Sequence, residues 1–132
     1  MINASAHSWN PGFSNLALST LIDKLPDGVV LTDSRGVIIR WNAAAVDITG
    51  ISVAVALGGF LWDVLHMLTP EAIRSPQALD QQQSSLSALL LDASEMHTIT
   101  ETRLIRRADG ESRNVQLTCF PLAAHGANHI AC

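Results

Sequence analysis

The stretch LPDGVVLTDSRGVIIRWNAAAVDITG, residues 25–50, contains two strand-like runs, a turn between them and the start of a helix. Residues 28–32 and 37–41 are rich in valine, isoleucine and leucine, a composition typical of strands. Between the runs, Asp33 can hydrogen-bond to the backbone two residues on, and Gly36 accepts a positive φ angle without steric cost. The stretch therefore predicts a β-hairpin with a tight turn.

Asn42 follows the hairpin and precedes a short alanine-rich segment, residues 43–49. An asparagine side chain accepts hydrogen bonds from the first free amides of a helix. A glycine just past the last helical residue, here Gly50, commonly ends one. We therefore expect a short helix between Asn42 and Gly50.

The order and spacing of these and later turn residues resemble the PAS domain family over residues 18–122. The resemblance implies an α+β fold with a five-stranded antiparallel sheet in the order 2-1-5-4-3. It also implies short helices on one face, an N-terminal flanking helix, and a ligand held between helices and sheet. The matching positions are Pro26, Asp27, Gly28, the turn at 33–36, Asn42 with Ala43, Gly50, Leu57, Gly58, Asp109 and Gly110.

Composition limits the classes of protein to which the chain can belong. Its 132 residues, 48% apolar and 15% charged, suit one compact domain. A formal charge of −4, with Arg103, Arg106 and Arg107 as the densest basic group, argues against a nucleic-acid surface. No window approaches a membrane span, and the first residues do not form a signal peptide. The default location is the cytoplasm.

The two cysteines, Cys119 and Cys132, match neither a disulfide framework nor a zinc-site spacing. We expect both to be reduced thiols. Because no cationic neighbour in the sequence would lower its pKa, Cys119 is interpreted as a buried, inert thiol rather than a redox switch.

The N-terminal region divides into two parts. Residues 1–13 are predicted to be disordered or irregular, with a proline–glycine pair as a breaker. Residues 14–25 are predicted to form the flanking helix, which a proline ends, and residues 26–132 the PAS domain itself. Two roles remain open for the helix: covering the sheet and mediating dimerisation. Its apolar stripe is Leu18, Leu21, Ile22 and Leu25.

Three helices are expected in the middle of the chain. The apolar segment 51–57 is assigned a short helix on the family pattern, although its β-branched residues also suit a strand. A threonine–proline pair predicts a helix of one to two turns near residues 70–74, and a serine–proline pair opens a longer helix over 76–95. The buried stripe of that helix is predicted to be Leu79, Leu86, Leu90 and Ala93.

Two further strands, residues 98–107 and 112–122, are joined by an Asp-Gly turn, which is a strong hairpin signal. Only residues 128–132 remain for the fifth strand. We therefore expect this central strand to be truncated, which would leave backbone groups of the first strand exposed.

Strand parity sorts the residues that face a ligand pocket. The family pattern places Val115, Leu117, Cys119 and Pro121 inward, and Phe120 and Leu122 outward. Glu101 and Arg103 share a face and would either pair as an exposed ion pair or, if inward, pair there or await an anionic ligand. The predicted pocket lining is Phe60, Trp62, Leu86, Leu90, Arg103, Val115, Leu117 and Cys119.

Cofactor chemistry is not expected. Haem-binding members of the family use a histidine on the long helix, and segment 76–95 has none. His66 and His97 flank it, and His66 is a weak candidate for a haem ligand, with a structural role preferred. The Asn-Cys-Arg motif of the family's flavin photosensors is absent. No catalytic or metal-binding motif is found, so the chain is not expected to be an enzyme.

The resemblance implies a sensory input domain of a larger signalling protein, with an attached output domain of the histidine kinase or diguanylate cyclase class. The expected ligand is small and largely apolar, with one acidic group to meet Arg103. The alternatives are a ligand-free dimerisation module and a haem-based gas or redox sensor. A homodimer is predicted, with the interface candidates Leu18, Leu21, Ile22, Phe120 and Leu122.

Overall fold

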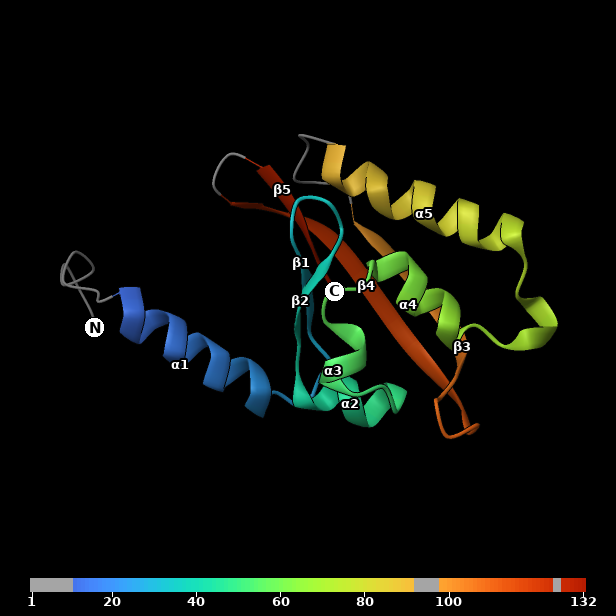
Figure 1. Ribbon diagram of the computed structural model, residues 1–132, viewed down its shortest axis with the longest axis horizontal. Helices are drawn as coiled ribbons and strands as arrows, with labels where there is room; N and C mark the ends of the chain where they lie inside the picture. The colour runs from blue at the N-terminus through green and yellow to red at the C-terminus, as the bar shows by residue number, and fades with distance from the viewer. Residues whose placement is uncertain (1–10, 92–97, 125–126) are drawn as a thin grey trace.

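The computed structural model describes residues 11–91, 98–124 and 127–132. Figure 1 shows the strands and the helices that flank them. The helices are α1 (Pro11–Lys24), α2 (Ala43–Thr49), α3 (Val53–Ala56), α4 (Leu61–Leu68), the 3-10 helix η2 (Glu71–Ile73) and α5 (Pro76–Leu91). The strands are β1 (Val30–Thr32), β2 (Ile38–Trp41), β3 (Ile99–Arg106), β4 (Ser112–Ala124) and β5 (Ala127–Ala131).

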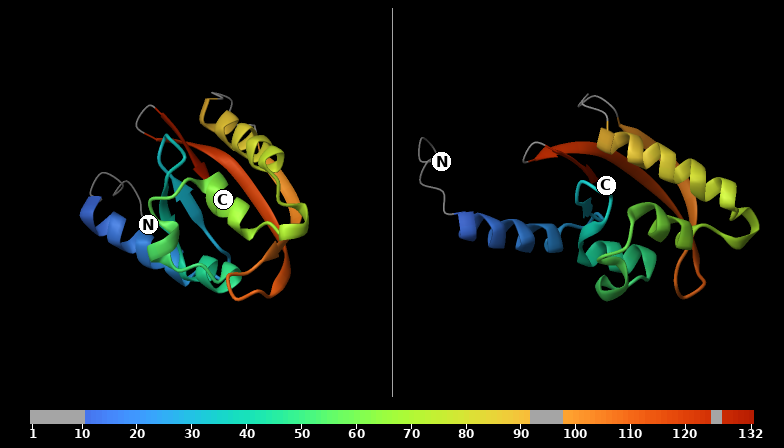
Figure 2. Two further views of the ribbon diagram at one scale, coloured as in Figure 1. Left: turned by 45° about the vertical axis from the view of Figure 1, so that its right-hand side comes forward. Right: turned by 45° about the horizontal axis from the view of Figure 1, so that its top comes forward.

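The five strands form one antiparallel sheet in the order β2-β1-β5-β4-β3, which confirms the predicted topology. Helices α2 to α5 lie on one face of this sheet (Figure 2). Strand β5 has five residues, and it pairs with β1 on one side and with β4 on the other. Both predicted hairpins therefore belong to a single sheet.

The β1–β2 turn is held by the side chain of Asp33. One carboxylate oxygen accepts hydrogen bonds from the amides of Arg35 at 2.8 Å and Val37 at 3.0 Å. Gly36 adopts a φ angle of 91°, and a Cβ on it would lie 2.5 Å from the Trp62 ring. Partial burial of Asp33 acts to raise its pKa, but the bonds from Arg35 and Val37 outweigh this and leave the pKa below its ordinary 3.8.

Asn42 links three segments of the chain. Its side-chain oxygen accepts from Val29 N at 2.8 Å and from Ala45 N at 3.0 Å, the second being the predicted helix cap. Its side-chain nitrogen donates to the carbonyls of Ile22 at 2.7 Å and Asp27 at 2.9 Å. All four hydrogen-bonding positions of a side chain that is 1% exposed are thus filled. Asn42 therefore ties α1, β1 and α2 together.

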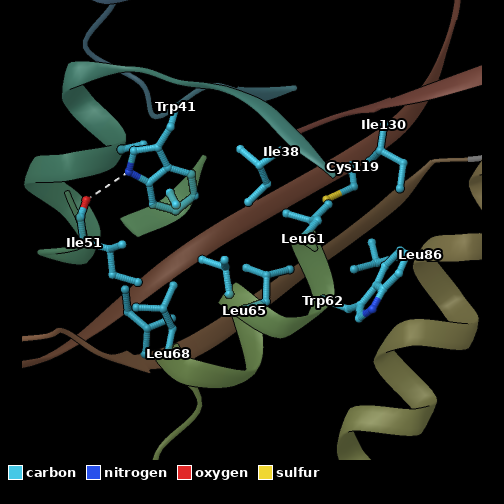
Figure 3. Packing of buried hydrophobic residues seen from close by; sticks show 14 of the residues in the cluster. Ile38, Trp41, Ile51, Leu61, Trp62, Leu65, Leu68, Leu86, Cys119 and Ile130 are labelled. Carbon is cyan, nitrogen blue, oxygen red and sulfur yellow. Dashed lines mark hydrogen bonds between the residues drawn. The ribbon is translucent and has the colours of Figure 1, made fainter. Parts of the chain in front are cut away.

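The hydrophobic core lies between the inner face of the sheet and helices α2 to α5 (Figure 3). Trp41 fills one end of it and donates its indole N–H to the Ile51 carbonyl at 3.0 Å. The predicted parity of β4 is confirmed, because Cys119 and Pro121 are buried while Phe120 and Leu122 are exposed. The core residues labelled in Figure 3 are Ile38, Trp41, Ile51, Leu61, Trp62, Leu65, Leu68, Leu86, Cys119 and Ile130.

Helix α1 begins at Pro11, three residues before the predicted start. The reason is that proline is well suited to the first turn of a helix, where its missing N–H is not needed, so the proline–glycine pair is not a breaker here. The helix extends away from the sheet (Figures 1 and 2), with Leu18 and Leu21 more than half exposed. The last turns of α1 contact β2, where Arg40 donates to the Ser19 hydroxyl at 2.7 Å, and the two roles named for the helix stay predictions. The prediction for residues 1–10 lies outside the described residues.

Helix α4 is not among the helices expected from the sequence, whereas the other middle helices follow the predictions with small differences. Helix α3 confirms the helical assignment of segment 51–57, and the turn predicted near residues 70–74 is the single 3-10 turn η2. Helix α5 is described to Leu91, so its predicted end and Ala93 lie outside the described residues. Its buried residues are Leu86 and Leu89, while Leu79 and Leu90 pack against the core from half-buried positions.

Candidate functional site

A hollow of about 530 Å³ lies between α5 and the β3–β4 hairpin, and we call it the α5 hollow. A helix packed over a sheet places side chains from both elements along such a space. Its floor is largely aliphatic and its rim is polar. It is lined by Thr69, Ile73, Ala78, Gln81, Gln82, Ser85, Leu86, Ile99, Glu101, Thr102, Arg103, Leu104, Leu117 and Cys119.

Arg103 is the cationic group of the α5 hollow. Its guanidinium donates to a carboxylate oxygen of Glu101 at 2.6 Å, and the side chains of the two residues are 21% and 41% exposed, respectively. Gln82 of α5 lies on the other side. With its amide oxygen turned to the arginine, that oxygen accepts from both terminal nitrogens at 2.9 Å. Glu101 and Arg103 thus form a partly buried ion pair on the inward face of β3, linked to the helix through Gln82.

The predicted pocket residues fall into two groups. Leu86, Arg103, Leu117 and Cys119 line the α5 hollow. The others do not belong to its lining, because they contribute to the packing of the domain instead. These are Phe60, Trp62, Leu90 and Val115.

The two aromatic residues of that second group pack on each other. The rings of Phe60 and Trp62 stack with centroids 5.0 Å apart. Trp62 is buried against Gly36 of the β1–β2 turn, whereas Phe60 is 40% exposed. This stack supports the hairpin turn, and neither ring is among the residues that line the α5 hollow.

Cys119 and Cys132 are joined by a disulfide, so the expectation of two reduced thiols is wrong. The cause is the strand register. Phe120 of β4 lies opposite Ala131 of β5. The neighbouring pair, Cys119 and Cys132, therefore also face each other, with their Cα atoms 4.3 Å apart. Directly opposed residues of antiparallel strands come this close at non-hydrogen-bonded positions. Cys119 is fully buried, and it brings the disulfide to the wall of the α5 hollow.

Sequence reasoning missed the polar lining that α5 supplies. Gln81, Gln82 and Ser85 lie on the rim of the α5 hollow, although the sequence places them in the polar part of the helix. The available signal was helical spacing, because Gln82 comes three residues after Leu79 and four before Leu86 and so shares the face of the apolar stripe. Their place along the α5 hollow depends on the position of α5 over β3, which the sequence does not give.

His66 lies in the last turn of α4 and is half-buried. It is not among the residues that line the α5 hollow. His97 lies outside the described residues. Within the described ranges, no group of three or more histidine, cysteine or acidic side chains is arranged to hold a metal ion.

The predicted interface residues occupy two separate surfaces. Leu18 and Leu21 lie on α1, 52% and 56% exposed, and Ile22 beside them is half-buried. Phe120 and Leu122 lie on the outer face of the sheet, 39% and 43% exposed. No helix among the described residues is both long and apolar enough to cross a membrane.

The family model of the PAS fold matches residues 16–132. None of the curated proteins matches the chain.

Several solved structures share the fold at identities below 20%. The PAS domain of an HTR-like protein from Haloarcula marismortui has a TM-score of 0.64 at 18% identity, covering 91% of this chain and 88% of that one. The PAS domain of BvgS from Bordetella pertussis has a TM-score of 0.64 at 18% identity, covering 90% and 82%. A domain of a sensory box sensor histidine kinase/response regulator from Geobacter sulfurreducens has a TM-score of 0.66 at 19% identity, covering 94% and 96%.

Proposed function

The chain belongs to the PAS family, and on that premise we propose that it is the sensory input domain of a larger signalling protein. Two of the similar structures come from sensor histidine kinases by their descriptions, which supports an attached output domain of that class, while the diguanylate cyclase class stays the alternative prediction. Any enzymatic activity of the signalling protein belongs to that output domain. The role of this chain is to bind a ligand and thereby shift the conformational state of the attached output domain.

The observation that carries the proposal is the α5 hollow. Its volume of about 530 Å³ lies within the range of small-molecule sites, and its lining combines aliphatic side chains with a few convergent polar groups. Leu86, Ile99 and Leu117 offer an apolar floor, while Arg103 offers a guanidinium. The ligand is a small, largely apolar molecule with one acidic group.

The ion pair within the hollow sets how an acidic ligand binds. Glu101 already neutralises Arg103, so a ligand carboxylate must displace Glu101 or Gln82 from the guanidinium. A bidentate arginine–carboxylate pair is among the strongest polar contacts available in a site of this kind. Affinity for acids should therefore rise when the competing charge of Glu101 is removed.

Thermal-shift screening of short aliphatic and aromatic acids tests the proposal. A bound acid raises the melting temperature by mass action, equivalent to about 2.7 kcal/mol at a hundred times its dissociation constant. Arg103→Ala should abolish the shift and Glu101→Gln should enlarge it, whereas Arg113→Ala, which removes an arginine outside the hollow, should leave it unchanged. A screen without hits, or a hit indifferent to Arg103→Ala, contradicts the proposal.

A second candidate function, pairing of subunits, is favoured by the apolar residues exposed on α1 and on the outer face of the sheet. Leu18, Leu21, Phe120 and Leu122 are each 39% or more exposed, which is more apolar surface than an isolated domain requires. We propose a homodimer with α1 in its interface. Light scattering of the chain with and without residues 1–24 tests it, because an equally strong dimer without the helix excludes α1.

The cytoplasmic location stays a prediction, and the disulfide provides a way to test it. Cytosolic thiols keep most cysteine pairs reduced, whereas an oxidising compartment preserves a disulfide. Thiol trapping in intact cells, with Cys119→Ser as the control, should find both cysteines reduced if the domain lies in the cytoplasm. A fully oxidised pair contradicts that location.

A further inference from the structure

A second hollow, of about 390 Å³, lies where the end of α4 meets the β3–β4 turn, and we call it the arginine hollow. The turn is the orange loop at the bottom of Figure 1. The floor of this hollow is apolar, and its walls carry three arginines and one aspartate. It is lined by Ile51, Met67, Leu68, Arg74, Arg106, Arg107, Ala108, Asp109 and Gly110.

The β3–β4 turn is a firm scaffold for these side chains. The Ala108 amide donates to the carbonyl of Thr49 at 3.1 Å, which anchors the turn to the end of α2. Within the turn, the Gly110 amide donates to the Arg107 carbonyl at 2.9 Å, and Gly110 has a φ angle of 92°. The Glu111 amide donates to a carboxylate oxygen of Asp109 at 3.0 Å. The backbone of the turn that carries Arg106 and Arg107 is therefore held in place before any ligand arrives.

Arg107 is a largely buried cation with little to neutralise it. Its side chain is 16% exposed, and its ion pair with Asp109 spans 3.4 Å to a carboxylate that is itself 54% exposed. Within the described ranges, no acceptor lies within hydrogen-bonding distance of its buried Nε. Nearly all buried polar groups find a partner, and a buried charge without one is costly. Arg107 therefore lacks the acceptors that a guanidinium of this burial normally has.

The other two arginines of the hollow differ in how many hydrogen bonds their side chains already make. Arg74 donates from Nε and one terminal nitrogen to the Thr69 carbonyl at 3.2 and 2.9 Å, so it closes the end of α4. Arg106, the last residue of β3, is exposed, and its side chain has no hydrogen bond or ion pair to any described residue. One of its terminal nitrogens lies 3.9 Å from where a Cβ on Gly110 would stand. Arg106 is thus free to meet a ligand at the turn.

We propose that the arginine hollow binds a small, soluble anion that bears a phosphate group. Arg106 and Arg107 both line this hollow, and their planar guanidiniums match the oxygens of a phosphate. A single carboxylate needs only one such partner, so the pair of arginines favours the more highly charged group. Ile51 and Leu68 supply an apolar surface for the organic part of the ligand. The site is separate from the α5 hollow and from Arg103.

Titration of pyrophosphate into the ¹⁵N-labelled protein tests the proposal. The amides of Ala108, Asp109 and Gly110 should shift and saturate. Arg106→Gln should weaken binding by about tenfold or more, because charged hydrogen bonds of this kind contribute about 1.5 to 3 kcal/mol. Arg113→Gln is the matched control, since it removes the same charge from the neighbouring strand, where Arg113 pairs with Glu111 at 3.0 Å. It should leave the affinity unchanged.

Three outcomes would overturn the proposal. The first is equal weakening by Arg106→Gln and Arg113→Gln, which would show that only the general charge of the domain matters. The second is malonate binding as tightly as pyrophosphate, which would exclude a preference for phosphate. The third is binding only to vesicles of phosphatidylcholine with phosphatidic acid, which would make the partner a membrane. Arg103→Ala should leave the pyrophosphate affinity unchanged, so the test is independent of the function proposed for the α5 hollow.

Discussion

Asn42 is a buried polar side chain and Arg107 a largely buried one, but the two differ in how many hydrogen-bond partners they have. Asn42 is 1% exposed, and four backbone groups from three segments fill every hydrogen-bonding position it has. Arg107 is 16% exposed on its side chain and has one distant ion pair. Asn42 therefore has no hydrogen-bonding position left for a ligand, whereas Arg107 has guanidinium donors without an acceptor.

The comparison teaches how to separate groups that hold the fold from groups that are available for binding. A buried polar group with all its hydrogen bonds made stabilises and specifies a structure. Its removal leaves each of its partners without a hydrogen bond. A poorly satisfied one contributes little to stability and gains most from a new partner. Stability measurements on variants of the two sites should therefore give opposite results.

The largest effect is expected for Asn42→Ala. The change leaves the Val29 amide and the carbonyls of Ile22 and Asp27 buried without the partner they had, and it removes the cap of α2. The free energy of unfolding should fall by about 3 to 5 kcal/mol, as measured by urea denaturation. Asn114→Ala, on the exposed face of β4, is the control and should change it little. Equal losses of stability in the two variants would contradict the role of Asn42 as a group that holds the fold.

An intermediate, pH-dependent effect is expected for Asp33→Asn. The folded protein lowers the pKa of Asp33, so its carboxylate contributes stability above the ordinary value of 3.8, and this contribution is lost as the pH falls through the folded pKa. The wild type should be more stable than the variant near neutral pH, and the difference should shrink below pH 3.8. Urea midpoints across this range give the measurement. A difference independent of pH would show that the charge of Asp33 has no role.

The smallest effect is expected for Arg107→Met. A methionine lacks the terminal nitrogen that lies 3.4 Å from where a Cβ on Gly50 would stand, but it keeps an apolar side chain and removes a poorly compensated charge, so the free energy of unfolding should stay the same or rise by up to about 1 kcal/mol. Arg103→Met is the matched control and should lower it, because Glu101 would lose its partner. A loss above about 2 kcal/mol for Arg107→Met would place Arg107 with Asn42, among the groups that hold the fold.

Much of the fold was predictable because its signals are local. Turn residues, strand composition and the cap at Asn42 operate within a few positions of the chain, and the family resemblance supplied the strand order that local patterns lack. The start of α1 was missed because a proline before a glycine suits both a turn and the first turn of a helix.

The features missed in the candidate site depend on contacts between distant segments. The disulfide follows from the register of β4 against β5, which places Cys119 opposite Cys132, and no composition rule contains that register. Parity placed Glu101 and Arg103 on one face, but only the packed sheet decides that this face is the inner one. Phe60 was assigned to the pocket by its apolar character, but it stacks on Trp62 and does not line the α5 hollow.

The pairing of β1 with β5 has a consequence for the order of folding. Val30 and Cys132 exchange backbone hydrogen bonds of 2.8 and 2.9 Å, and Thr32 receives bonds from His129 and Ile130, so the middle of the sheet joins segments about a hundred residues apart. Closing so long a loop costs chain entropy before any contact repays it, and topologies rich in such contacts fold slowly. The hairpins β1–β2, β3–β4 and β4–β5 can form early from neighbouring residues, whereas the pairing of β1 with β5 completes the sheet last. The transition state for folding should then contain formed hairpins and a β1 that is not yet paired with β5.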